Sequence, residues 1–150
     1  MVRNWLAQVG IRLETKEIPW AELVTGARMR QCDLFFLGWT GDTGDPDNFV
    51  QPLFNSTNHG DLGNRTFFTD AGIDAKLAAG QSIRDPERRR QHYQELQRLL
   101  HDLAPWVFLS YEDQFLVTRP EVRGLSLHPL GMVYLENAWL DPTMNRGKDE

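Results

Sequence analysis

Residues 34–39 of this 150-residue chain have the sequence Leu-Phe-Phe-Leu-Gly-Trp, a continuous apolar run without alternation. Such a run is typical of a strand that is buried on both faces of a parallel sheet. Upstream, residues 11–18 alternate apolar and polar side chains at their start and predict another strand, while residues 20–30 show the apolar spacing of a short helix. Strand, helix and buried strand together predict a βαβ unit in an α/β fold, whose crossover is almost always right-handed.

Helices are predicted on both sides of this unit. A short amphipathic helix at the N-terminus ends at Gly10, because glycine commonly stops a helix. A second helix opens at Pro46, with Asp45 as its N-cap, and a third begins at Thr69-Asp70. Residues 55–69 are rich in Asn, Gly, Ser and Thr, which predicts an exposed loop.

The longest predicted helix covers residues 86–103. Asp85 precedes it as an N-cap, Pro86 occupies its first turn, and leucines recur along one face. Its arginines are expected to form a solvated outer face, and they are Arg84, Arg88, Arg89, Arg90 and Arg98. Beyond this helix, strands are predicted over residues 106–111 and 115–118, followed by irregular β structure over residues 122–140.

The composition excludes several classes of protein. Apolar residues make up 41% of the chain and charged residues 25%, an ordinary globular balance. Sixteen Lys and Arg against 21 Asp and Glu give a formal charge of −5, so no nucleic-acid partner is expected. The single Cys32 excludes an internal disulfide framework and a cysteine zinc site. No apolar run reaches the roughly 18 residues of a membrane helix, and the N-terminus lacks the apolar core of a secretion signal.

The acidic segment that follows residue 38 allows several interpretations of Asp42, Asp45 and Asp47. A calcium loop of the EF-hand type needs Glu at its twelfth position, which is Leu53 when counted from Asp42. Asp42-Thr43-Gly44 matches the tripeptide of aspartic proteases, but helices flank it instead of an all-β framework. A carboxylate pair for general acid–base catalysis has no accompanying nucleophile motif. A stand-alone acidic metal-binding or hydrolytic module stays open as an alternative.

A site for a cationic ligand explains this segment better. A carboxylate just past a buried strand can pair with an ammonium group, and Asp42 has this position. The glycines allow close approach to the backbone, and the edge groups of residues 38–40 can bond an extended peptide as an added strand. The indole of Trp39 offers a flat apolar surface beside it, whereas Asp45 fits a cap better. The predicted ligand-binding residues are Gly38, Trp39, Thr40, Gly41 and Asp42.

These motifs resemble those of family 5 extracytoplasmic solute-binding proteins, the peptide-, dipeptide- and nickel-type receptors of ABC importers. The resemblance extends along nearly the whole chain and points most to the dipeptide-binding branch. The segments that carry it are Val9-Gly10-Ile11, Asp33 to Asp42, Gly44 to Phe49, Asp85-Pro86-Glu87-Arg88, His101 to Pro105, Arg119 to Gly124, His128 to Gly131 and Glu136-Asn137.

The resemblance implies part of a type II periplasmic-binding-protein-like α/β fold, which encloses a short peptide and hands it to an ABC permease of the inner membrane. Asp42 would pair with the α-ammonium of the peptide, and the region of Trp39 would line the same pocket. Residues 1–112 would be a partial C-terminal lobe, and residues 113–150 would return through the hinge to the first lobe. No catalysis, cofactor or metal is implied.

Members of this family are much longer, so the resemblance also implies lobes and a secretion signal that lie outside this chain. The missing lobes would then be a partner of this chain, and its location would be periplasmic or extracytoplasmic. A truncated product without a function of its own is the other alternative that the sequence leaves open.

Overall fold

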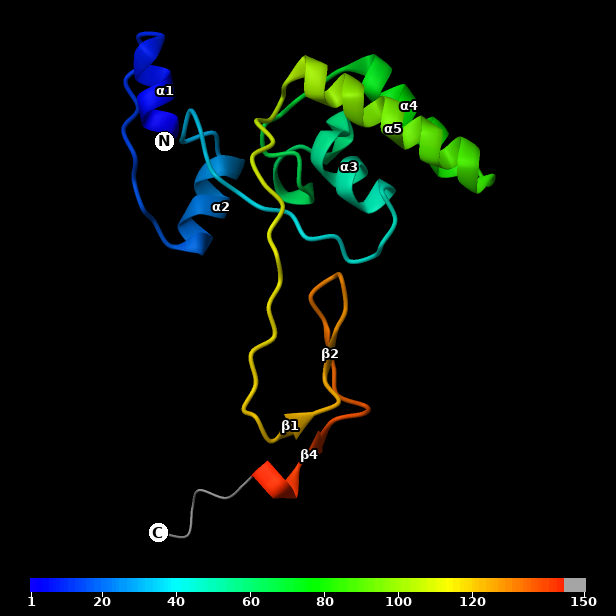
Figure 1. Ribbon diagram of the computed structural model, residues 1–150. Helices are drawn as coiled ribbons and strands as arrows, with labels where there is room; N and C mark the ends of the chain where they lie inside the picture. Colours follow the sequence, from blue (N-terminus) through cyan, green and yellow to red (C-terminus); the bar gives the residue numbers. More distant parts are fainter. Residues whose placement is uncertain (145–150) are drawn as a thin grey trace.

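The computed structural model describes residues 1–144, which form helices in the first two thirds and short strands toward the C-terminus (Figure 1). The helices are α1 (Val2–Gln8), α2 (Trp20–Arg28), α3 (Asp47–Phe54), α4 (Ala71–Ser82) and α5 (Pro86–Leu103). The short 3-10 turns are η1 (Ser56–Asn58), η2 (Gly60–Leu62) and η3 (Pro142–Met144). The strands are β1 (Val122–Arg123), β2 (Ser126–Leu127), β3 (Val133–Tyr134) and β4 (Trp139–Leu140). Within residues 1–144, no helix is both long and apolar enough to cross a membrane.

The two longest helices begin where their capping residues predict. Asp85 Oδ1 accepts a hydrogen bond from the backbone N–H of Arg88 at 2.8 Å, and Asp70 Oδ1 accepts one from Ile73 at 2.9 Å. These bonds satisfy N–H groups that have no partner inside their own helix. The predictions of α4 and α5 are therefore confirmed, as is the N-terminal helix that ends before Gly10.

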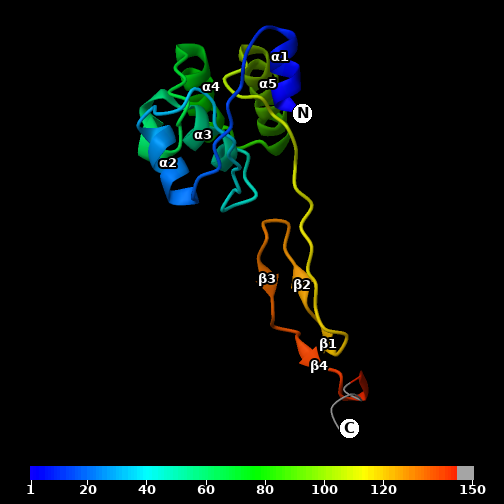
Figure 2. The same ribbon diagram turned by 90° about the vertical axis from the view of Figure 1, so that its left-hand side faces the viewer.

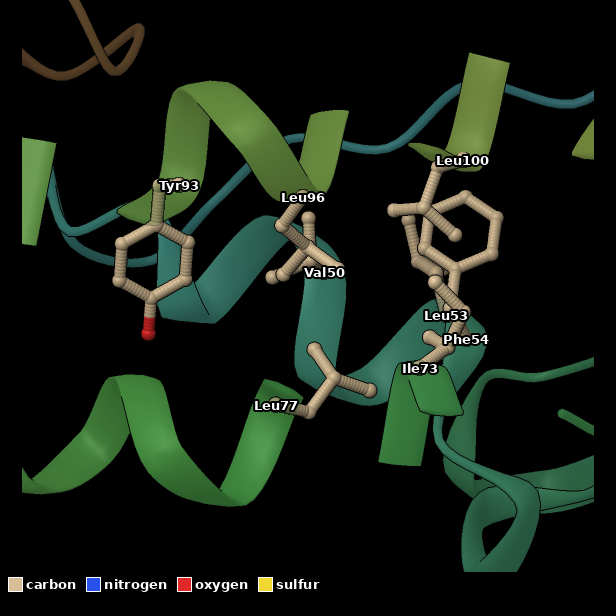
Figure 3. Close-up of a cluster of buried hydrophobic side chains, with 8 residues drawn as sticks. All are labelled: Val50, Leu53, Phe54, Ile73, Leu77, Tyr93, Leu96 and Leu100. Carbon is tan, nitrogen blue, oxygen red and sulfur yellow. The ribbon is translucent and has the colours of Figure 1, made fainter. Parts of the chain in front are cut away.

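Helices α3, α4 and α5 share one apolar core, which Figure 3 shows in close-up. Leu77 of α4 and Leu96 of α5 are completely buried in it. Burial of such a side chain contributes roughly 1.5–3 kcal/mol. The core consists of Val50, Leu53, Phe54, Ile73, Leu77, Tyr93, Leu96 and Leu100. Because three core residues belong to α3, this core fixes the helix that directly follows the acidic segment.

The segment from residue 55 to residue 69 is compact, which corrects the prediction of an exposed loop. Asn64 is completely buried, and its Nδ2 donates to the carbonyl oxygens of Asn55 at 3.0 Å and Phe68 at 2.9 Å. Its Oδ1 accepts from the backbone N–H of Phe68 at 3.1 Å. One buried amide thus satisfies backbone groups that a regular helix or sheet would otherwise pair.

The predicted βαβ unit is not formed as a paired sheet among the described residues. Helix α2 is present, but residues 11–18 and 34–39 lie in no strand, and Leu34 and Phe36 are 62% and 72% exposed. The strands predicted within residues 106–118 are also unpaired. A strand is stabilised by hydrogen bonds to a neighbouring strand. No other segment of residues 1–144 pairs with these runs, and they therefore form no sheet.

The irregular β structure predicted for residues 122–140 is confirmed. Strand β1 pairs with β4 and β2 with β3, both antiparallel, in two separate sheets. Gly124 has a φ of +73° at the turn after β1, and a Cβ there would collide with the carbonyl oxygen of Asn137. Figure 2 shows these strand pairs at the end of the extended run that leaves α5, away from the helices.

Candidate ligand-binding site

The predicted site lies on the segment that leads into α3, the cyan stretch of chain in Figure 1. This segment carries three carboxylates, from Asp42, Asp45 and Asp47. Their surroundings differ, because helices α4 and α5 supply partners for two of them. These partners decide which carboxylate is available to a ligand.

Asp45 is held by the chain itself. Its Oδ1 accepts from the backbone N–H of Asp47 at 2.8 Å, which is the capping role that the sequence predicts, although the helix begins at Asp47. Arg89 Nη2 donates to both oxygens of Asp45, at 2.8 and 3.0 Å. Burial acts to raise the pKa of Asp45, but the hydrogen bond from Asp47 and the guanidinium of Arg89 outweigh it and lower this pKa below its ordinary value.

Arg89 is therefore not part of a solvated arginine face, which corrects the prediction for this residue. Its side chain is 22% exposed, and its Nη1 donates to the carbonyl oxygen of Gly80 in α4. The guanidinium carbon lies 4.9 Å from the ring centroid of Tyr93. Arg89 thus connects the acidic segment to both α4 and α5.

Asp47 also has partners within the chain. Its Oδ1 accepts from the hydroxyl of Tyr93 at 3.0 Å, and its Oδ2 accepts from Gln81 Nε2 at 3.3 Å. Burial, together with the hydrogen bond to Asp47 and the charge of that residue, raises the pKa of Tyr93 to about 12. Asp47 therefore joins α3 to the other two helices of the core.

Asp42 differs from both of these carboxylates. Its backbone N–H donates to Asn48 Oδ1 at 2.6 Å, but among residues 1–144 its carboxylate forms no ion pair and accepts no hydrogen bond. The residue is exposed to solvent. Asp42 is accordingly the carboxylate of this segment that can pair with a ligand without first breaking an internal contact.

The other four predicted residues have different environments. Trp39 is half-buried against the helical core, and its indole Nε1 donates to the carbonyl oxygen of Asn48 at 3.1 Å. Gly41 is buried, and a Cβ there would lie 2.6 Å from the ring of Phe49, so glycine is required by the packing of the chain itself. Gly38 and Thr40 are exposed, with open space beside Gly38.

A polar depression of about 270 Å³ lies next to the segment, but its charged groups already pair with one another. It is lined by Thr43, Asp45, Asp47, Asn48, Gln81 and Arg89. Within residues 1–144, no three His, Cys, Asp or Glu side chains are grouped so that they could hold a metal ion. The alternative of a metal-binding module built on Asp42, Asp45 and Asp47 therefore gains no support from the geometry of these residues.

Sequence reasoning did not identify Asn48, Arg89 and Tyr93 as members of this network. Arg89 and Tyr93 lie 44 and 46 residues from the aspartates that they contact, and no local pattern reports such a distance. Asn48 carried a weak signal, because a short polar side chain in the first turn of a helix commonly bonds to nearby backbone.

No family model matches the chain. It is 37% identical, over 84% of its length and 24% of the relative's, to a protein named probable di/tripeptide-binding protein 5 from Pseudomonas aeruginosa (strain UCBPP-PA14). It is 30% identical, over 87% of its length and 24% of the relative's, to heme-binding protein A from Haemophilus influenzae (strain ATCC 51907 / DSM 11121 / KW20 / Rd). The chain thus spans about a quarter of the length of these curated relatives.

Among solved structures, the chain matches a dipeptide-binding protein from Pseudoalteromonas sp. SM9913 in complex with Met-Leu, with a TM-score of 0.80 and 26% identity. The match covers 92% of this chain and 27% of that one. It confirms the predicted fold class, part of a periplasmic-binding-protein-like α/β fold. The resemblance seen in the motifs is also confirmed, since the chain is similar to one part of the dipeptide-binding members of the family 5 extracytoplasmic solute-binding proteins.

Proposed function

We propose that this chain contributes the acidic part of a peptide-binding site, in which Asp42 pairs with the α-ammonium of a short peptide. The observation that carries the proposal is the contrast among the three carboxylates. Asp45 and Asp47 are engaged by Arg89, Tyr93 and Gln81, whereas the carboxylate of Asp42 has no partner within residues 1–144. An exposed ion pair is worth about 1 kcal/mol or less, and its strength grows when the site excludes water.

The backbone beside Asp42 supports the same proposal. The main-chain groups of residues 33–44 form no hydrogen bond with other main-chain groups of the described chain. The main-chain groups of residues 38–40 can therefore bond an extended peptide as an added strand, which binds its main chain without selecting side chains. The exposed Gly38 leaves open space for this approach, and Trp39 offers an apolar ring beside it.

The enclosing part of the site would come from polypeptide that covers the extended run after α5. Residues 105–118 form no backbone hydrogen bond within the described chain, and Val107, Phe115 and Val117 are 81%, 83% and 90% exposed. Unpaired strand edges with apolar side chains are typical surfaces for pairing with another strand. In a receptor of full length, residues 1–112 would belong to the C-terminal lobe, and the part of this surface from residue 113 onward would lie against the first lobe.

The relatives named for peptides fit this site better than the relative named for heme. Heme carries carboxylate groups, which the charge of Asp42 would repel, whereas a peptide offers a terminal ammonium. The relatives are named as binding proteins, so the site would capture its ligand without chemical change. Delivery to an ABC permease of the inner membrane, from a periplasmic or extracytoplasmic location, is part of the same proposal.

The test is a tryptophan-fluorescence titration of the purified chain with Met-Leu and with N-acetyl-Met-Leu. Met-Leu is the ligand of the matched Pseudoalteromonas structure, and acetylation removes the charge that Asp42 would meet. We expect the free peptide to bind up to about fivefold more tightly, the preference that an exposed ion pair of about 1 kcal/mol gives. Trp39→Phe should remove the fluorescence response and so identify the reporter.

Asp42→Asn should abolish the preference for the free peptide. Asp33→Asn is the matched control, because Asp33 is also exposed and forms no ion pair or side-chain hydrogen bond within residues 1–144. Both variants change the net charge equally. Equal binding of the free and acetylated peptides by the unaltered chain would contradict the proposal, and so would an Asp42→Asn variant that keeps the preference.

A further inference from the structure

Asn48, in the first turn of α3, contacts both of the residues on which the proposed site depends most. Its side-chain oxygen holds the backbone of Asp42, and its main-chain oxygen holds the indole of Trp39. We infer that Asn48 is a positioning residue that fixes Asp42 and Trp39 relative to each other and to α3. This inference rests on the proposed function, because Asn48 itself would not touch the peptide.

The side-chain contact sets the direction of the backbone at Asp42. The N–H of Asp42 donates to Asn48 Oδ1 at 2.6 Å. A Cβ on the preceding residue, Gly41, would lie 3.1 Å from this same oxygen and 2.6 Å from the ring of Phe49. Glycine at position 41 therefore lets the backbone come close enough for the bond to form.

The main-chain contact depends on a proline inside α3. In a regular helix the carbonyl of Asn48 would accept from the N–H of residue 52, four positions later. That residue is Pro52, which has no N–H. The carbonyl oxygen of Asn48 is consequently free to accept from Trp39 Nε1 at 3.1 Å. The proline thus leaves this carbonyl without its helical donor, and the indole N–H of Trp39 supplies one instead.

Helix α3 gives Asn48 a rigid base. Val50, Leu53 and Phe54 are 6%, 4% and 3% exposed in the core, and Asp47, next to Asn48, is held by the hydroxyl of Tyr93 at 3.0 Å. Because both contacts of Asn48 start from this base, the backbone of Asp42 and the indole of Trp39 keep a constant spacing. A ligand ammonium and the neighbouring apolar group would then meet them together, without ordering the segment first.

The test combines peptide binding with amide exchange in substituted forms of the 150-residue chain. Asn48→Ala removes the acceptor for Asp42, while Asn48→Asp keeps an acceptor oxygen at the same position. Asn58→Ala is the matched control, because Asn58 Nδ2 makes a comparable bond of 2.8 Å to the carbonyl oxygen of Gln51 near the other end of α3. Binding is measured with Met-Leu and N-acetyl-Met-Leu.

We expect Asn48→Ala to lose most of the preference for the free peptide, because the backbone of Asp42 loses the hydrogen bond that fixes it. Asn48→Asp should retain the preference, and Asn58→Ala should lower stability without changing it. A purely structural role would predict the same outcome for Asn48→Ala and Asn58→Ala, and that result would overturn the inference.

Exchange of single protons by NMR, without peptide, separates this inference from the proposed function. The Asp42 amide should be protected in the unaltered chain and lose protection in Asn48→Ala, while the Trp39 indole proton stays protected in both. Pro52→Ala should lower the protection of the Trp39 indole proton and leave that of the Asp42 amide unchanged. The new N–H of residue 52 competes for the carbonyl of Asn48, although alanine itself favours the helix. An unprotected Asp42 amide in the unaltered chain would overturn the inference even if peptide binds. A protected amide in a chain that shows no ammonium preference would refute the proposed function, and with it the positioning role.

Discussion

The helical region, residues 47–104, buries its large apolar side chains, whereas the C-terminal region, residues 105–140, leaves many of them exposed. In the helical region, Leu77 and Leu96 are completely buried. In the C-terminal region, Val107 and Phe115 remain 81% and 83% exposed, and each strand has only two residues. The first region finds its packing partners within its own sequence, whereas the second presents surface that another strand or lobe could cover.

The most direct test of this difference is to remove one large apolar side chain from each region and compare the loss of stability. Leu96→Ala should lower the free energy of unfolding by roughly 2–5 kcal/mol, because Leu96 is completely buried and the change leaves a cavity. Phe115→Ala should change it by less than about 0.5 kcal/mol, because Phe115 already contacts water. Urea unfolding followed by circular dichroism measures both. A comparable loss in the two variants would show that the regions do not differ.

A smaller effect is expected from the polar contacts that support the helical core. Tyr93→Phe removes the hydrogen bond to Asp47 and should cost about 1–2 kcal/mol at neutral pH. Burial and Asp47 raise the pKa of Tyr93 from 10.0 to about 12, so its contribution is complete below pH 10 and declines as the pH rises toward 12. Urea unfolding across this range should show a steeper decline for the unaltered chain than for Tyr93→Phe, and parallel curves would contradict this role of Tyr93.

The smallest effect should come from two ion pairs, each made by an arginine of one of the two regions. Arg89→Gln frees Asp45 and should cost less than about 1 kcal/mol, since the pair is partly exposed. The pKa of Asp45 is lowered despite burial, so its contribution is present above the ordinary value of 3.8 and is lost as the pH falls below it. The variant should therefore show a weaker acid dependence of unfolding than the unaltered chain.

Arg123→Gln is the matched change in the C-terminal region. Arg123 Nε lies 3.9 Å from Asp141 Oδ2, and the hydrogen bonds from Thr143 are the main cause that lowers the pKa of Asp141. We therefore expect no measurable change in stability or in its acid dependence. An acid dependence altered as strongly as in Arg89→Gln would show that both regions rely on their ion pairs alike.

The same contrast explains how much of the fold could be predicted from the sequence. Helix α5 follows from signals within a few residues, namely the Asp85 cap and a proline in the first turn, and it begins and ends as predicted. The run at residues 34–39 has the sequence of a buried strand, but a strand also needs a neighbour, which a local pattern does not supply. Local signals therefore predicted the helices correctly and the pairing of this strand wrongly.

The candidate site, too, could be predicted from the sequence only in part. Asp42 could be singled out because its position after an apolar run and its side-chain chemistry are both visible in the sequence. The partner of Asp45 is Arg89, which is 44 residues away along the chain. That Asp42 has no such partner within residues 1–144 is likewise visible only in the structure. The role of Pro52 in freeing the carbonyl of Asn48 requires the position of Trp39 in space.

The extended run after α5 also determines where the chain is open to proteolysis. Proteases bind their substrates as extended, unpaired strands, and residues 105–118 already have that conformation. Chymotrypsin, whose specificity pocket accepts large apolar side chains, should therefore cleave beside Tyr111 and Phe115 before it attacks α5. Such a cut would release the helices with the acidic segment from the strand pairs, and protection of these two bonds would report the binding of any partner that covers the run.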